Sequence, residues 1–257
     1  MVPPTYFLVF MALTYSGCDA YKALVVTQMP SKSHSILNNA IVKQLLKEGN
    51  EVTFIRSIEY KNATPSLRQI DVSSNAEVLK GALNIKSIMN KAESVNDYYT
   101  IKKRMTAISI NTIENKDVQK LLSDTNERFD VVIVEFLDND LLTSFAAVFN
   151  CPMIWLSPIE VNSDILSRID AIPNPAYVAD TLSTNITPFT FGQRVAVLWS
   201  RIKAQFLYFM YIDDIQNKAY IRLISPLIVK RGRQPPPFYD VKRNVSLVLG
   251  YSHPSLG

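Results

Sequence analysis

The chain has 257 residues, with 27 lysine or arginine residues, 23 acidic residues and a formal net charge of +4. With 47% hydrophobic residues, it is long enough to bury the core of one large α/β domain or two small ones. The small, scattered positive charge argues against a nucleic-acid-binding protein. One basic cluster, Lys230, Arg231 and Arg233, is expected to lie in a solvated loop.

The first 20 residues have the features of a secretory signal peptide. An apolar run covers residues 6–13, and Cys18-Asp19-Ala20 offers a cleavage site with small residues. The run is too short to span a bilayer. No lysine or arginine precedes the run, whereas a signal peptide usually begins with a basic residue. The alternative is that the run is a buried first strand, but Pro3-Pro4 is a poor start for a strand. We therefore expect residues 1–20 to be removed and residues 21–257 to fold.

Cysteines and asparagines fit a secretory route. Loss of Cys18 with the signal peptide would leave Cys151 alone, so no intrachain disulfide is expected. Cys151 precedes a proline at the start of an apolar run and is expected to be buried. Glycosylation sequons begin at Asn62, Asn185 and Asn244.

Apolar runs alternate with helical patterns along the rest of the chain. Such runs are typical of strands buried on both faces, and spacing of three to four residues is typical of helices. In chain order the patterns predict a strand at 21–27, a helix from 36 to a stop at Gly49, a strand at 52–55, mainly helix over 75–122, a strand at 129–134, a helix at 141–149, a strand at 152–156, a long helix at 192–223 and a strand at 245–249.

This alternation predicts an α/β fold: a Rossmann-like, doubly wound, mostly parallel sheet. The long helix at 192–223 carries an apolar stripe that includes Val195, Trp199 and Phe206. Core packing is the preferred interpretation of this stripe, and the wall of a ligand pocket is the alternative.

Several common catalytic motifs are absent from the sequence. It contains no phosphate-binding P-loop, no glycine-rich dinucleotide fingerprint, no nucleophile elbow and no paired-histidine or paired-cysteine metal motif. With two histidines in the chain and one cysteine expected in the mature form, neither a metal site nor a bound cofactor is expected.

His34 is the first candidate for chemistry. It is predicted to lie in the loop after the first strand, just before a helix that Ser33 or Ser35 would cap. In a doubly wound sheet this is the carboxyl edge, where ligands bind. An imidazole there can act as a general base, although a single loop histidine is more often structural.

Acidic residues follow the strand at 129–134, at the same predicted edge. Glu135 ends that strand, and Asp138 and Asp140 come soon after it. A carboxylate here could orient His34 and stabilise its charged form. The alternatives are that Glu135 is solvated and that Asp140 caps the next helix. The second histidine, His253, has no evident partner and is interpreted as structural.

Several segments resemble the animal UDP-glycosyltransferases, and they occur in the family's order. They are the Ser-His loop, a Leu-rich helix end with Val-Thr, a Phe-Asp strand with an acidic end, a Phe-Asn-x-Pro turn, an Asn-Pro-x-Tyr-Val stretch, an aromatic-x-x-Arg helix start, and a last strand with the Ser-His and Ser-Leu-Gly that follow it, which resembles the end of the family's N-terminal domain. In this sequence they are residues 30–35, 45–53, 129–135, 149–152, 174–178, 191–194 and 244–257.

The resemblance implies the N-terminal, acceptor-binding domain of a two-domain GT-B glycosyltransferase. The family's catalytic histidine falls on His34, and its acidic partner falls on Glu135 or, failing that, Asp140. The implied reaction transfers glucose or glucuronic acid from a UDP-sugar to the hydroxyl of a small lipophilic acceptor, with inversion. Tyr98, Tyr99, Trp199, Phe206 and Phe209 could wall the acceptor pocket.

The family's UDP-sugar-binding domain and membrane anchor would follow residue 257. The chain alone is therefore expected to be inactive. In the full-length protein we expect the endoplasmic reticulum lumen or membrane as the location, and a homodimer is one option for its assembly. The alternative function is a non-catalytic, secreted protein that binds lipophilic small molecules.

Overall fold

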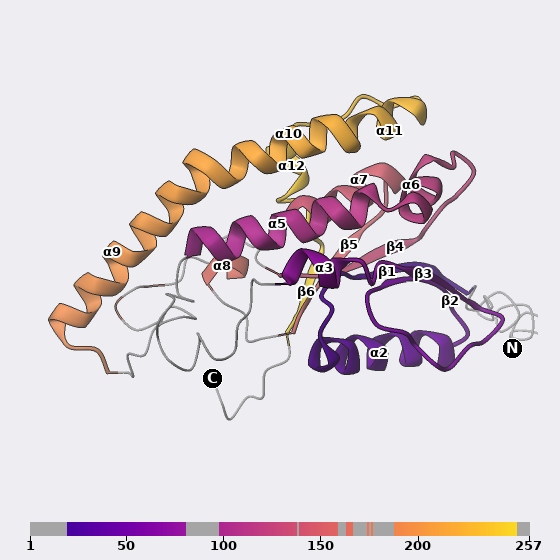
Figure 1. Ribbon diagram of the computed structural model, residues 1–257, viewed down its shortest axis with the longest axis horizontal. Helices are drawn as coiled ribbons and strands as arrows, with labels where there is room; N and C mark the ends of the chain where they lie inside the picture. The colour runs from indigo at the N-terminus through magenta and orange to yellow at the C-terminus, as the bar shows by residue number, and fades with distance from the viewer. Residues whose placement is uncertain are drawn as a thin grey trace, which may run out of the picture.

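A parallel β-sheet forms the centre of the molecule (Figure 1). The computed structural model describes residues 20–80, 98–137, 139–158, 163–166, 174, 176 and 188–250. Within them the sheet has six strands in the order β3-β2-β1-β4-β5-β6, and every neighbouring pair is parallel. The strands are β1 Lys22–Thr27, β2 Glu51–Arg56, β3 Leu67–Asp71, β4 Val131–Glu135, β5 Met153–Ser157 and β6 Leu247–Gly250.

The strand order reverses at β1. From β1 the chain winds outward to β2 and β3, then returns to place β4 against the other side of β1. In the register of this central pair, Val26 lies beside Val134. The predicted doubly wound, Rossmann-like sheet is therefore confirmed, with its switch point between β1 and β4.

Helices cover both faces of the sheet (Figure 1). On one face lies α2, and on the other lie α5, α6 and α7, with α10 and α11 outside them. The helices are α2 Lys32–Lys47, α3 Asn75–Leu79, α5 Tyr98–Glu114, α6 Lys116–Ser123, α7 Ser144–Phe149, α8 Ser163–Leu166, α9 Phe191–Leu207, α10 Asp213–Leu223, α11 Ser225–Lys230 and α12 Phe238–Val241, together with the 3-10 helix η1 Leu141–Thr143 and the π-helix η2 Tyr208–Ile212.

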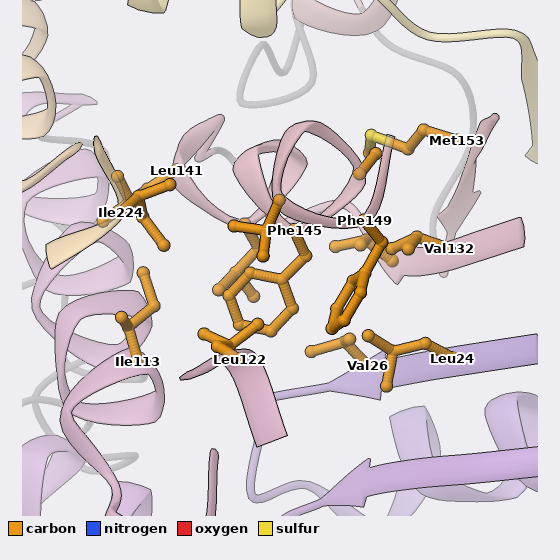
Figure 2. Close-up of a cluster of buried hydrophobic side chains, with 14 of the residues drawn as sticks. Leu24, Val26, Ile113, Leu122, Val132, Leu141, Phe145, Phe149, Met153 and Ile224 are labelled. Atoms are coloured by element: carbon orange, nitrogen blue, oxygen red, sulfur yellow. The ribbon is translucent and has the colours of Figure 1, made fainter. Parts of the chain in front are cut away.

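The apolar core has two layers because side chains alternate along each strand. Leu24 and Val26 of β1 join the larger cluster, under α5, α6 and α7, while Val25 joins the smaller cluster against α2. Figure 2 shows the larger cluster: Phe149 of α7 points toward the two β1 side chains. Burial on both faces explains why β1, β2, β4 and β5 appear in the sequence as continuous apolar runs.

The predicted stop of α2 at Gly49 is confirmed. Gly49 has φ +85°, a conformation that favours glycine, and its N–H donates to the Leu46 carbonyl at 3.1 Å. The next N–H, of Asn50, donates to the Leu45 carbonyl at 3.1 Å. These bonds satisfy carbonyls at the helix end and turn the chain directly into β2.

The edge strand β3 was not predicted. Its five residues have one buried side chain, Ile70, and the polar residues Arg68, Gln69 and Asp71 surround it. An edge strand has a paired neighbour on one side only, so it needs no apolar run. For this reason the hydrophobic pattern does not reveal it.

Two predictions, one for the apolar stripe on α9 and one for the basic cluster at residues 230–233, are wrong. The apolar stripe on α9 is not core, since Val195, Trp199 and Phe206 are at least 50% exposed. The basic cluster is not a solvated loop, because Arg231 donates to the carbonyls of Asp124 and Glu127, and its guanidinium lies over the Phe149 ring at 4.8 Å. No described helix is long and apolar enough to cross a membrane.

A buried carboxylate holds the amino ends of the strands together. Glu127, in the loop before β4, accepts hydrogen bonds from Lys22 of β1 and Arg68 of β3. Its burial opposes ionisation, but the hydrogen bonds and positive charges of these two partners outweigh it and hold the pKa of Glu127 below its usual value of 4.5. The ion pairs therefore join the first strand, the edge strand and the loop that leads into β4.

Replacing Glu127 by glutamine should destabilise the fold by about 1.5–3 kcal/mol at neutral pH, the range for hydrogen bonds to a charged group. A lowered pKa stabilises the folded state above pH 4.5 and ceases to do so as the pH falls through the folded value. Urea unfolding at pH 7 and pH 3 should therefore show a difference between wild type and variant that shrinks in acid. Glu51→Gln, at an exposed carboxylate on the same edge, is the matched control; an equal loss at both pH values would contradict the account.

Candidate active site

The candidate site lies at the carboxyl ends of β1 and β4, where the strand order reverses. β1 ends at Thr27 and β4 ends at Glu135, and the two strands are direct neighbours. Connections from these strands leave toward opposite sides of the sheet, so a crevice opens between them in folds of this kind. Residues that follow β1 and end β4 are therefore brought to one place.

His34 lies in the first turn of α2 and not in the loop before it. The helix begins at Lys32 with Ser31 as its N-cap residue, and no side chain caps it. Neither Ser33 nor Ser35 is therefore the cap: the Ser35 hydroxyl donates to the Ser31 carbonyl at 2.9 Å, and the Ser33 hydroxyl lies 2.9 Å from that of Ser31. Helical backbone fixes the direction of the His34 side chain more firmly than a loop would.

His34 and Glu135 form a hydrogen-bonded pair. Nδ1 of His34 lies 2.7 Å from Oε1 of Glu135, and the carboxylate is fully buried while the imidazole keeps 20% of its surface exposed. An ionised carboxylate can only accept, so in the neutral imidazole the proton lies on Nδ1 and the lone pair on Nε2. The pair thus presents a basic nitrogen on a ring that its partner orients, the arrangement that general-base catalysis requires.

Asn38 is a third member of the site that the sequence analysis missed. Its Nδ2 donates to the same Glu135 oxygen at 3.0 Å, and the side chain is fully buried. It follows His34 by four residues on α2, so both face the same way. This four-residue spacing was the feature of the sequence that could have indicated Asn38. Oε2 of Glu135 and Oδ1 of Asn38 are buried with no hydrogen-bond partner among the described residues.

The other acidic candidate, Asp140, has a different partner. It is buried, and its Oδ2 accepts a hydrogen bond from the Tyr208 hydroxyl at 2.7 Å. Asp140 is the N-cap residue of η1, but its side chain makes no capping hydrogen bond. The Leu141 N–H donates to Oδ1 of Asn139 at 2.7 Å. The structure thus places Glu135, not Asp140, on His34. Asp138 and His253 lie outside the described residues.

A buried polar network fixes the chain between β1 and α2. The Gln28 carbonyl accepts from Ser57 at 2.6 Å and from Asn75 at 2.8 Å. The Gln28 side chain accepts from Ser109 at 2.7 Å, and Asn75 also donates to Thr112 at 2.9 Å. A fully bonded network in a low-dielectric interior is stiff, so it holds the segment that leads to His34.

In the part of the chain that the structure describes, neither a reactive thiol nor a metal cluster offers an alternative chemistry. Cys151 is half-buried, less than predicted, and burial, reinforced by the charge of Asp130, raises the pKa of its thiol to about 11. Because the thiolate is the nucleophile, Cys151 is unreactive near neutral pH. No cluster of three or more metal-ligating side chains occurs in the described part of the chain.

The predicted aromatic wall is not assembled around one cavity in the described residues. Tyr99 of α5 packs edge-on against Tyr211 of η2, with ring centroids 5.6 Å apart. Trp199, Phe206 and Phe209 are each at least 59% exposed. The Tyr98 side chain lies outside the described residues.

Curated proteins similar to the chain are UDP-glucosyltransferases. UDP-glucosyltransferase 2 of Dactylopius coccus is 25% identical over 247 residues, which are 96% of this chain and 46% of that protein. The ecdysteroid UDP-glucosyltransferase of Orgyia pseudotsugata multicapsid polyhedrosis virus is 28% identical over 60% of this chain and 33% of its own length. No protein-family model matches the chain.

Among solved structures, one titled "Crystal structure of LpCGTa in complex with UDP" covers 70% of this chain and 43% of its own length. Its sequence identity is 14% and its TM-score is 0.36, so the fold description rests on the sheet topology of this chain alone.

The fold and the site define an α/β protein with a histidine–carboxylate pair at the switch point of its sheet. The curated relatives confirm the predicted resemblance: the proteins to which the chain is similar are named as UDP-glucosyltransferases. It spans about half the length of the first of these relatives.

The hydrogen bond to Glu135 should fix the tautomer of His34. In long-range ¹H–¹⁵N spectra of the neutral imidazole we expect the proton on Nδ1, whereas histidine in water prefers it on Nε2. Glu135→Ala should return His34 toward the Nε2–H form, and Asn38→Ala, which keeps the carboxylate, should not. The chain has two histidines, so His253→Gln identifies the signal. An Nε2–H tautomer in the wild type would contradict the proposed pairing.

Proposed function

We propose that the chain is the acceptor-binding half of an inverting UDP-glycosyltransferase in which His34 is the general base. The observation that carries the proposal is the 2.7 Å bond between His34 and a fully buried Glu135 at the sheet's switch point. Similarity to UDP-glucosyltransferases over 96% of the chain supports it. A ligand crevice is expected at this edge of a doubly wound sheet.

Each member of the site has a role in the proposed reaction. Nε2 of His34 takes the proton of the acceptor hydroxyl as its oxygen attacks the anomeric carbon of the sugar. The bond from that carbon to the UDP oxygen breaks, and UDP leaves with the electron pair. Glu135 stabilises the imidazolium that forms, and Asn38 holds the carboxylate in place through its 3.0 Å bond.

The names of the relatives indicate which donor and acceptor to propose, and the part of their length that the chain covers indicates where the donor would bind. Those relatives are named as glucosyltransferases, so we propose UDP-glucose as the donor, ahead of UDP-glucuronic acid. One relative is named for ecdysteroids, so a hydroxylated steroid is a reasonable class of acceptor. Since the chain covers about half of the first relative, the donor would bind mainly to a second domain.

The proposal is tested by joining the chain to the donor-binding half of a relative and measuring glucose transfer to hydroxylated steroids and phenols. His34→Ala should lower kcat by about 10²–10⁴-fold, the usual contribution of acid–base catalysis. Glu135→Gln should also lower kcat, because an amide cannot stabilise the imidazolium, while Glu51→Gln at an exposed carboxylate should not.

Full activity of the His34→Ala fusion would contradict the role of His34. An inactive wild-type fusion, together with tight binding of lipophiles to the chain alone, would favour a non-catalytic binding protein instead. Circular dichroism of each variant separates loss of chemistry from loss of fold.

A further inference from the structure

The outer face of α9 and η2 carries an exposed apolar stripe. Its spacing repeats every three to four residues, so all of its members lie on one side of the helix. Each is between 47% and 82% exposed. The members are Phe191, Val195, Leu198, Trp199, Ile202, Phe206, Phe209 and Met210.

The opposite side of the same helices faces the body of the protein. Val197 and Ile212 are buried there, and the Tyr208 hydroxyl donates to Asp140. Figure 1 shows α9 running away from the sheet as an extension of the line of α10. The apolar stripe thus points away from the core that would otherwise bury it.

Charge along this segment has one sign. Residues 188–212 contain Arg194, Arg201 and Lys203 and no acidic residue. Acidic residues begin at Asp213, which is paired with Lys242, and Asp214, which is paired with Lys218. The exposed charged residues of the segment, Arg194 and Lys203, are both basic. A helix with one apolar, aromatic face and basic flanks is the type that lies flat in the headgroup region of an anionic bilayer.

We propose that the stripe on α9 and η2 docks this chain onto an anionic lipid surface, with the helix axis parallel to the membrane. The 22 residues of α9 and η2 span about 33 Å at the rise of an α-helix, which gives a long contact line. Trp199 and Phe206 would enter the interface, and Lys203 would meet lipid phosphates or carboxylates.

Charge favours lipid over a second copy of the chain. Two-fold pairing of this face would bring Arg194 and Lys203 of both copies together, and the stripe itself contains no acidic residue. An anionic headgroup layer supplies that neutralising charge along the whole helix. The docking surface is independent of the reaction proposed above, because it contains no residue of the His34 site.

The two tryptophans allow a direct test. Trp199 is 67% exposed and Trp155 is fully buried, so a change in emission on binding reports Trp199. The chain is mixed with vesicles of phosphatidylcholine alone or with about 30% phosphatidylserine. With the anionic vesicles we expect a blue shift, and quenching by lipids brominated on the acyl chain; with neutral vesicles we expect weaker binding.

Variants at exposed positions separate the stripe from the rest of the surface. Trp199→Ser with Phe206→Ser should weaken partitioning at least about tenfold, since two large aromatic contacts are lost. Ile221→Ser with Val229→Ser removes apolar groups of similar exposure outside the stripe and should leave partitioning unchanged. Lys203→Gln should weaken binding to anionic vesicles about fivefold and leave binding to neutral vesicles unaltered.

Absence of vesicle binding by the folded wild-type chain would overturn the proposal. So would equal binding to neutral and anionic vesicles, or equal losses in the stripe variant and its control. If sedimentation instead shows a dimer that the Trp199→Ser, Phe206→Ser variant dissociates, and vesicles do not bind, the face is a self-association surface and the lipid proposal is wrong.

Discussion

The position of β1 constrains everything else in this structure. It is hydrogen-bonded to parallel strands on both sides and buried on both faces, so it cannot shift without disrupting the whole sheet. The chain leaves it toward β2 and later returns to its other side as β4. Parallel strands present their carboxyl ends at one edge, so segments about 100 residues apart in sequence, from His34 to Glu135, meet there.

The two ends of the sheet contain buried carboxylates with different tasks. At the amino end Glu127 has two cationic partners, Lys22 and Arg68. Their charges offset the cost of burying the carboxylate, and the ion pairs join two strands to the loop before β4. At the carboxyl end Glu135 is more deeply buried, and its hydrogen-bond partners among the described residues are an imidazole and an amide, neither of them a permanent cation. A carboxylate with so little compensation is costly to bury, and such sites are more often functional than structural.

Much of the fold follows from the sequence, because four of the six strands, β1, β2, β4 and β5, are largely buried on both faces and leave continuous apolar runs. The second edge strand, β6, also has an apolar sequence, although it is mostly exposed. β3 was missed because an edge strand needs no such run. Of the site, His34 and Glu135 could be placed at one edge by topology, but the choice of Glu135 over Asp140 depended on side-chain geometry. For Asn38, the sequence offered only its spacing of four residues from His34. The hydrogen-bond network around Gln28 joins residues that share no sequence motif. The apolar residues of α9 have the spacing of a helix that packs against a core. Whether that face is buried depends on where the helix lies in the fold, which the spacing does not reveal.

The central claim is that His34 removes a proton from the acceptor hydroxyl. The most direct measurement is transfer by the fused two-domain protein to acceptors of graded acidity, from aliphatic alcohols to nitrophenols, with wild type and His34→Ala. A base matters most where the hydroxyl is least acidic. We predict a loss of about 10²–10⁴-fold for alcohols that falls steadily and nearly vanishes for acceptors already ionised at the assay pH. A loss of the same size for every acceptor would contradict the account and would make His34 a structural residue.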